Sequence, residues 1–241
     1  KSNNIYATTS IVHAVDTTLT MEKVTFTNNG SYCLNLGIDN VFSSLILLDD
    51  STFRLFGDSK FTNNAATFMI NVKDDSNVYV EDTTFIDNNS FVMYSALQHY
   101  DDSYFKNCTF EGSNGLRNCY AGETCVFEDC VFSGDVYGVH FDGGDHNVTF
   151  TRCQFSGFNA FGSEIPLLTM NECTFKSNGK SGYNGVNLWG ETVMNNTIFA
   201  FDGQASTEWI GLNAAGSGKV IALNGCKALD ADKNELSLLD Y

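Results

Sequence analysis

One short stretch of the chain places His140 and Asp142 at alternating positions, with apolar residues beside and between them. Because alternate residues of a strand face opposite sides, both polar side chains are expected to face outward. A histidine and a carboxylate two residues apart can bind a metal ion or exchange protons with a substrate. Arg117 and Glu164, which lie about one repeat earlier and one later, could complete such a site.

Acidic residues recur in the turns that precede successive predicted strands. If the strands stack, these carboxylates line one edge, where like charges repel unless water or a cation separates them. Calcium, a hard cation that takes carboxylate ligands, is therefore the expected cofactor if there is one. The alternative is a solvated acidic edge that blocks sideways strand pairing. The calcium candidates are Asp74, Asp75, Asp101, Asp102 and Asp145.

Trp189 and Trp209 occupy corresponding positions in neighbouring repeats, and the alternation of apolar residues around them places both outward. Exposed aromatic side chains can stack on sugar rings or anchor a partner. Packing beneath a loop is the alternative. The pair is the candidate carbohydrate-binding face.

The eight cysteines include no C-x-x-C pair, which argues against a zinc site. Four of them recur at one offset in consecutive repeats and are expected to form a buried, unbonded column, because a free cysteine packs as a small apolar side chain. Cys119 and Cys125 are assigned to one loop, where they could form a disulfide. The four column cysteines are Cys108, Cys130, Cys153 and Cys173.

Asn-x-Ser/Thr sequons occur at five positions and, with the cysteines, favour a secreted or cell-surface glycoprotein. Asn29 and Asn88 fall in a recurring turn, where their side chains are expected to cap backbone groups in an inward ladder. Asn107, Asn147 and Asn195 fall in polar bends or turns and are the glycosylation candidates.

The net charge is −16, from 13 Lys and Arg against 29 Asp and Glu. This argues against nucleic-acid binding, which needs a basic surface, and against binding to anionic lipid. No apolar run reaches the ~18 residues of a membrane-spanning helix. We therefore expect neither a nucleic-acid partner nor insertion into a membrane.

A phenylalanine marks each repeat, and the spacing from Phe26 to Phe199 is 173 residues in seven steps, about 25 per step. The residue five positions earlier is apolar and the residue two positions earlier is small, so the period is two and the elements are strands. Stacked coils, each of three short strands, return one residue type to one place. The anchors are Phe26, Phe61, Phe85, Phe110, Phe132, Phe155, Phe175 and Phe199.

The chain is thus predicted to be an all-β, right-handed parallel β-helix of about nine coils in a single domain, residues 1–241. The long step after Phe26 predicts an insertion loop at about 30–40, and loss of the pattern after Ala228 predicts a cap at about 228–241. Strand signals before the first full coil suggest part of a longer protein or assembly.

The motif Phe-x-x-Asn, present at Phe26, Phe61, Phe85 and Phe175, resembles the repeat of the polymorphic outer-membrane-protein family. The wider architecture is similar to the pectin-lyase-like superfamily. The first resemblance implies an extracellular adhesive or structural solenoid. Enzymes on the second architecture combine a proton acceptor with a charge-neutralising Arg, Lys or calcium.

These observations favour a non-catalytic, extracellular structural or adhesive module of a surface or filament protein. Its expected partners are other protein subunits or further β-helix coils, and glycans as a further class. Two alternatives stay open: a carbohydrate-binding module using Trp189 and Trp209, and a polysaccharide lyase or epimerase using the site around His140.

Overall fold

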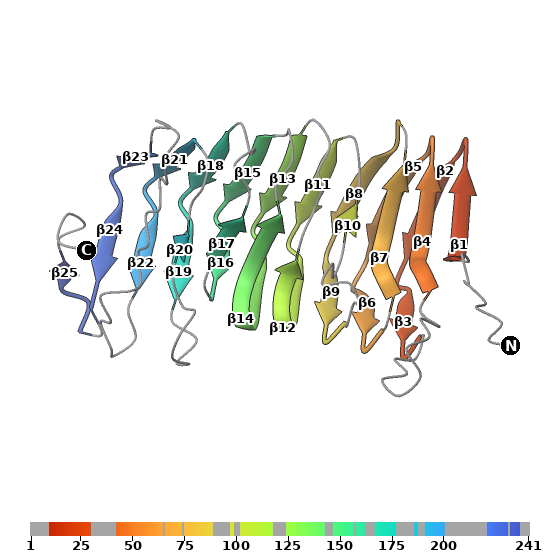
Figure 1. Cartoon of the computed structure of the whole chain (residues 1–241), viewed down its shortest axis with the longest axis horizontal. Coiled ribbons are helices and arrows are strands. Elements are labelled where there is room, and N and C mark those ends of the chain that lie inside the picture. The colour runs from red at the N-terminus through yellow and green to blue at the C-terminus, as the bar shows by residue number, and fades with distance from the viewer. Residues whose placement is uncertain are drawn as a thin grey trace, which may run out of the picture.

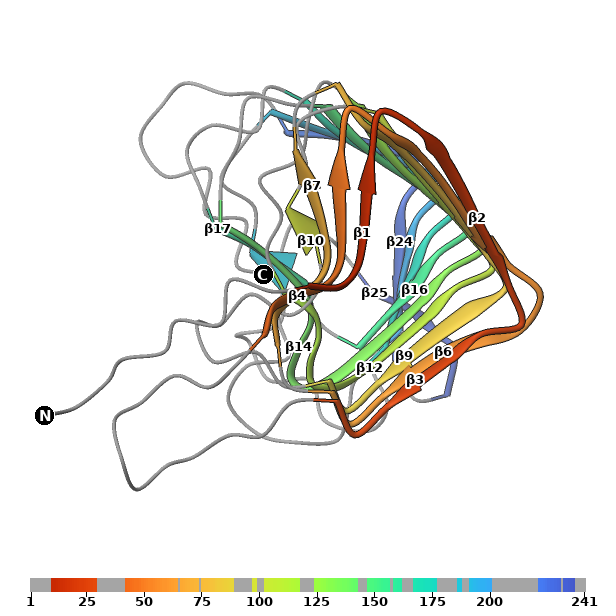
Figure 2. The same ribbon diagram turned by 90° about the vertical axis from the view of Figure 1, so that its right-hand side faces the viewer.

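The computed structural model describes residues 10–29, 42–64, 66–73, 75–88, 97–98, 102–117, 124–142, 147–156, 158–161, 167–176, 186–187, 191–200, 221–230 and 232–236. They form strands that wind as successive coils along one axis (Figure 1). Viewed down that axis, the strands gather into parallel sheets around a common interior (Figure 2). Among these residues, no helix is long and apolar enough to cross a membrane.

Three sheets, parallel except for the last strand, Glu235–Leu236, form the walls of the solenoid. The four-stranded sheet contains β1 (Ser10–Val15), β4 (Phe42–Asp49), β7 (Ala66–Lys73) and β10 (Leu97–Gln98). The nine-stranded sheet contains β2 (Thr18–Glu22), β5 (Thr52–Phe56), β8 (Asn77–Glu81), β11 (Ser103–Lys106), β13 (Thr124–Glu128), β15 (Asn147–Thr151), β18 (Leu168–Asn171), β21 (Thr192–Asn195) and β23 (Ile221–Asn224).

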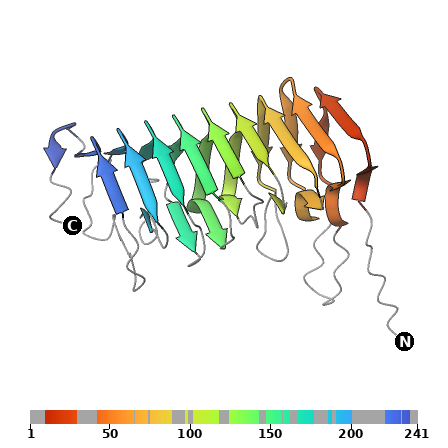
Figure 3. The same cartoon turned by 90° about the horizontal axis from the view of Figure 1, so that it is seen from above.

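The twelve-stranded sheet carries the phenylalanine anchors. It contains β3 (Thr25–Thr27), β6 (Ser59–Thr62), β9 (Thr83–Ile86), β12 (Thr109–Arg117), β14 (Val131–Asp142), β16 (Gln154–Phe155), β17 (Phe158–Phe161), β19 (Thr174–Lys176), β20 (Val186–Asn187), β22 (Ile198–Ala200), β24 (Lys227–Leu229) and β25 (Glu235–Leu236). The nine strands of the neighbouring sheet, seen in sequence order in Figure 3, confirm the predicted parallel β-helix of nine coils.

Two columns of phenylalanine rings fill the core. The anchor rings pair in register from coil to coil, and neighbouring centroids lie 4.9–5.2 Å apart. A second column on the nine-stranded sheet, Phe105, Phe127 and Phe150, meets the first edge to face, as Phe127 does with Phe132 at 5.4 Å. Both ring geometries are favourable for aromatic pairs, so the columns support each other.

The corner between the nine-stranded and twelve-stranded sheets is made by one residue in the left-handed conformation in each coil. Its φ lies between 50° and 64° in Lys23, Asp82, Asn107, Asp129, Arg152, Glu172, Asn196 and Gly225. The second coil has one extra corner residue, so both Gly57 and Asp58 have positive φ. At Gly225 a Cβ would lie 2.6 Å from the Asn196 Oδ1, so a larger residue there would displace the Asn196 side chain.

Separate second and third strands in every coil were expected, and this is wrong in the fourth and fifth coils. There β12 and β14 run on without the break that follows β3, β6 and β9. The first three coils turn on a left-handed Asn28, Asn63 or Asp87 followed by an asparagine. Gly112 and Gly134 take that position later, with no asparagine after them, so the chain continues with a bulge after Gly112.

The predicted insertion at about 30–40 lies outside the described residues. At the other end, β25 pairs antiparallel with β24, the only antiparallel pair among the described strands. That strand falls within the segment predicted to be a cap.

Phe132 tests whether the ring column carries the stability. Phe132→Ala should lower the free energy of unfolding by about 3–5 kcal/mol, because it removes a fully buried ring and leaves a cavity. The matched control is Val131→Ala, whose side chain is 37% exposed and should cost far less. Urea unfolding followed by circular dichroism gives the free energy of unfolding of each variant. Equal losses in the two variants would contradict a stabilising role of the ring column.

Candidate functional site

The predicted acid–base residues lie on neighbouring strands. In the register of β12 and β14, Arg117 pairs with His140, and Asp142 lies two residues further along β14. The backbone therefore brings together Arg117 and His140, as the repeat predicted. Glu164 lies outside the described residues, so the fourth member stays a prediction.

Other candidates fall only partly within the described residues. Asp75 and Asp102 are exposed at turns, as a solvated or cation-bound acidic edge requires. Asp74, Asp101, Asp145, Trp189 and Trp209 lie outside the described residues. In the part of the chain that is described, no group of three His, Cys, Asp or Glu side chains is placed to hold a metal ion. Calcium binding and the tryptophan face stay predictions.

Cys125 was assigned to a loop with Cys119, and this assignment is wrong. Cys125 lies in β13, its side chain is fully buried, and its thiol is free. The Ser103 hydroxyl donates to its Sγ at 3.2 Å, and burial raises the pKa of the thiol to about 12. The strand simply begins at Thr124, earlier than the sequence indicated. Cys119 lies outside the described residues.

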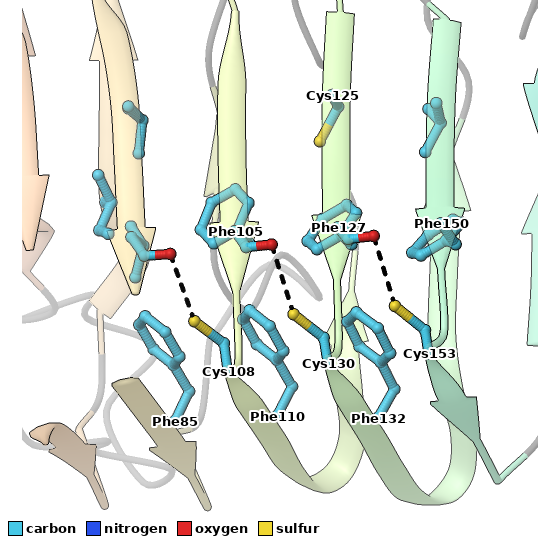
Figure 4. Close-up of a cluster of buried hydrophobic side chains, with 14 of the residues drawn as sticks. Phe85, Phe105, Cys108, Phe110, Cys125, Phe127, Cys130, Phe132, Phe150 and Cys153 are labelled. Atoms are coloured by element: carbon cyan, nitrogen blue, oxygen red, sulfur yellow. Dashed lines mark hydrogen bonds between the residues drawn. The ribbon is translucent and has the colours of Figure 1, made fainter. Parts of the chain in front are cut away.

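The predicted cysteine column is present, buried and unbonded. Cys108, Cys130, Cys153 and Cys173 have free thiols and are at most 1% exposed. Figure 4 shows three of these thiols directed at carbonyl groups of the preceding coil. Burial raises the pKa of the Cys130 thiol, so it is held as a protonated donor.

The column is defined by hydrogen-bond donation as well as by size. The Cys130 Sγ lies 3.3 Å from the Glu128 carbonyl oxygen, just before the corner. Thr83 and Thr197 donate from their hydroxyl groups to the equivalent carbonyls of Glu81 and Asn195. Ser, Thr and Cys are therefore interchangeable in this column because each is small and carries a donor.

Corner carbonyls also accept a backbone hydrogen bond from the preceding coil. The Asn107 N–H donates to the Glu128 carbonyl at 2.9 Å, and the Asp129 N–H donates to the Thr151 carbonyl at 3.0 Å. The left-handed corner residue thus aims its N–H at the following coil. Where the column side chain donates to the same carbonyl, two donors satisfy both lone pairs, so the corner can repeat without a cost in unpaired backbone.

Two asparagine ladders flank the core. Asn64 donates from Nδ2 to the Phe26 carbonyl, and Asn88 donates from Nδ2 to the Phe61 carbonyl, both at 2.9 Å. The predicted capping is therefore confirmed for Asn88, whereas the Asn29 side chain joins the ladder by donating to the Asn64 side chain at 2.8 Å.

The second ladder includes a glycosylation candidate. Asn195 donates from Nδ2 to Asn171 at 2.8 Å and accepts from Asn224 at 2.9 Å. A glycan on Asn195 would replace one of its two Nδ2 hydrogens, leaving one for the bond to Asn171. Asn107 and Asn147 are exposed, although the Asn107 Nδ2 donates to Asp82 at 2.6 Å.

A network of polar side chains crosses the outer surface of three coils. The Tyr104 hydroxyl donates to Glu128 at 2.6 Å. Arg152 pairs with Asp129 through two bonds of 2.8 and 2.9 Å and also contacts Glu128. Hydrogen bonds from Tyr104 and then Arg152 hold the pKa of Glu128 below its ordinary value, and Arg152 lowers that of Asp129.

This network is arranged to hold its protons fixed. The hydrogen bond to Glu128, helped by burial, raises the pKa of Tyr104 to about 12, so the phenol stays protonated. Two ionised carboxylates and a permanently charged guanidinium face it. A catalytic proton acceptor needs a pKa near the working pH, which these residues do not have. Their hydrogen bonds instead link neighbouring coils.

Sequence reasoning missed the network and the donor role of the column. Both had a signal: Tyr104, Glu128 and Arg152 lie four, two and one residues before successive column cysteines. Aligned coils bring residues at neighbouring offsets within reach of each other, so opposite charges at neighbouring offsets predict pairing.

A family model described as a right handed beta helix region matches residues 1–165 and, in a second overlapping match, 95–237. No curated protein and no solved structure matches the chain. The two family-model matches agree with the fold. They do not extend to the polymorphic outer-membrane-protein family.

Substitution of Cys130 separates size from hydrogen bonding in the column. Cys130→Thr keeps a donor that the fold already uses at Thr83 and Thr197, and should unfold close to wild type. Cys130→Val matches threonine in shape and lacks the donor, so it should be less stable by about 1 kcal/mol. Thermal melting decides, and equal stabilities would mean that only size matters.

Proposed function

The chain belongs to the right-handed β-helix family, and we propose that it serves as an extracellular structural or adhesive module of a surface or filament protein. The observation that supports this is the unbroken run of nine parallel strands. Each coil presents its outward side chains at the ~4.8 Å spacing of a β-sheet, which makes a long ribbed face. Such a face suits extended partners, namely protein subunits, further coils or glycans.

The described polar groups are consistent with a scaffold. Side-chain donors in the cysteine and asparagine columns bind backbone or each other, and Arg152 is paired with two carboxylates. These groups stabilise neighbouring coils against separation. Calcium bound to the acidic turns would add to this stabilisation. Thermal melting with calcium or with EDTA tests whether it does.

Adhesion is tested with the purified chain coupled to beads. We expect saturable binding to extracellular-matrix proteins or to a glycan array, and secretion of the tagged protein by its native cell. Beads coated with Phe132→Ala chain, unfolded by mild heating, are the control for non-specific contact. Absence of binding to every surface, together with retention inside the cell, would reject the proposal.

If glycans bind, the tryptophan pair can be separated from the rest of the surface. Loss of glycan binding in Trp189→Ala and Trp209→Ala would favour the carbohydrate-binding module. Retained binding would leave the ribbed faces as the adhesive surface.

A polysaccharide lyase or epimerase is the second candidate, favoured by the pairing of Arg117 with His140 on adjacent strands. A lyase would use His140 as proton acceptor and release unsaturated products that absorb ultraviolet light. His140→Ala should abolish this signal and leave the melting temperature unchanged. No absorbance from wild-type protein on acidic polysaccharides would remove the lyase, and proton exchange into product tests the epimerase.

A further inference from the structure

The corner of the second coil differs from the other corners in its hydrogen bonding. In the first coil and in the third to eighth coils, the N–H of the left-handed corner residue donates to a carbonyl of the following coil, as Asp82 does to Lys106 at 3.1 Å. At the second coil neither the Gly57 N–H nor the Asp58 N–H has a hydrogen-bond partner among the described residues. Both residues are only half buried. Successive N–H groups in a turn can form an anion-binding concavity.

The cations on either side of this corner have no carboxylate partner. Arg54 is exposed on β5, and its guanidinium lies over the Tyr79 ring, 5.1 Å from the ring centroid. Lys60 is exposed on β6. Neither forms an ion pair in the part of the chain that the structure describes. Acidic residues outnumber basic ones by 29 to 13, so these two unpaired cations are not explained by a shortage of carboxylates.

Carboxylates of the two neighbouring coils are engaged by cations of their own. Glu22 pairs with Lys23 at 3.2 Å, and Glu81 pairs with Lys106 at 3.8 Å. The carboxylate that belongs to the second corner itself is that of Asp58, which is half buried. Its negative charge opposes a bound anion. Removal of this charge should therefore strengthen anion binding, which no general loss of structure would do.

Unbonded hydroxyl groups surround both cations. The hydroxyl side chains that pair with Arg54 and Lys60 in the strand register have no hydrogen-bond partner among the described residues. They belong to Thr20, Tyr79, Thr25 and Thr84. Tyr79 is also 41% exposed, so part of its ring is open to contact. Hydroxyl groups donate and accept hydrogen bonds, and aromatic side chains contact apolar surfaces such as those of sugar rings.

We propose that the corner of the second coil is an oxyanion-binding site for acidic glycans. The N–H groups of Gly57 and Asp58, with Arg54 and Lys60 on either side, bind the carboxylate or sulfate groups of the sugar chain. The inference rests on the proposed adhesive function and specifies a ligand class and a site. The net charge of −16 repels densely charged polymers, so glycans with widely spaced acidic groups are the expected ligands.

Dextran and two of its derivatives test the ligand class, because they share one polysaccharide backbone. Carboxymethyl-dextran and dextran sulfate are prepared with equally low substitution and titrated into the full chain in a calorimeter. We expect binding of at least one derivative, weakened by added salt, and no binding of unmodified dextran. The derivative that binds more tightly identifies the group that is recognised. Equal binding of all three polymers, or binding of none, would overturn the inference.

Substitution of the two cations locates the site. Arg54→Gln and Lys60→Gln should each weaken binding of the recognised derivative about tenfold, as expected for loss of a hydrogen bond to a charged group. Lys233→Gln is the matched control, because Lys233 is also exposed and has no ion pair among the described residues. It changes the net charge equally and should leave the affinity nearly unchanged. Equal losses in all three variants would indicate non-specific attraction and contradict this site.

The corner itself is tested by two further variants. Deletion of Gly57 leaves one corner residue, as in the other coils, so the Asp58 N–H would donate to the Glu81 carbonyl and the affinity should fall. Asp58→Asn removes the opposing charge, tolerates the positive φ, and should bind more tightly. Circular dichroism establishes that each variant is folded. Wild-type affinity in a folded deletion variant, or no gain in Asp58→Asn, would overturn the role of the corner. If the deletion variant unfolds, Asp58→Asn is the deciding variant.

Bead adhesion of the same preparations separates this site from the proposed function. Wild-type protein that adheres to matrix proteins but binds no dextran derivative would reject the site alone. Wild-type protein that binds a derivative in the calorimeter, adheres to no surface and stays inside its native cell would reject the adhesive function alone.

Discussion

In-register parallel stacking is the constraint on which the rest of this structure depends. Each residue meets its own counterpart one coil away, ~4.8 Å along the axis, so every position must be compatible with itself. Phenylalanine satisfies this by ring stacking at about 5 Å, and asparagine by donating and accepting through one amide. The repeated residue types are those that form favourable pairs with a copy of themselves.

Charged residues do not satisfy this rule, and their placement shows how the fold responds. Along the last position of the nine-stranded sheet, Lys106 lies between Glu81 and Glu128 in adjacent coils. Arg152 then bridges the next pair of carboxylates. With a net charge of −16, the chain has few cations, and Lys106 and Arg152 lie where neighbouring coils would otherwise face each other with like charges.

The amino-acid sequence predicts the solenoid because its signal is redundant. A phenylalanine at a fixed offset in eight coils defines the fold even where one coil is irregular. The asparagine ladder that includes Asn29 and Asn88 could be predicted for the same reason. The donor role of the cysteine column could not, because smallness and hydrogen-bond donation coincide in Ser, Thr and Cys. Cys125 was misplaced because one residue at a strand boundary decides whether a thiol faces a loop or the core.

The candidate site was predictable only at the level of register. A repeat places Arg117 beside His140 once the coils are aligned, and that alignment follows from the phenylalanine anchors. The Tyr104–Glu128–Arg152 network needed the same alignment plus attention to charges at neighbouring offsets. Continuous strands in the fourth and fifth coils depend on a glycine and on the absence of an asparagine after it. These are differences in single coils, so the period of the repeat does not predict them.

The column of buried thiols has a consequence for how the chain reaches this state. A thiol attacks or is oxidised only while solvent and reagents reach it, and disulfide exchange takes seconds to hours. Closure of the fourth to seventh coils buries their column cysteines and removes them from that competition, whereas Cys226, in the last coil, stays half exposed. In an oxidising environment, winding of the coils would therefore compete with disulfide formation, and the coils that close last would be the most exposed to mispairing.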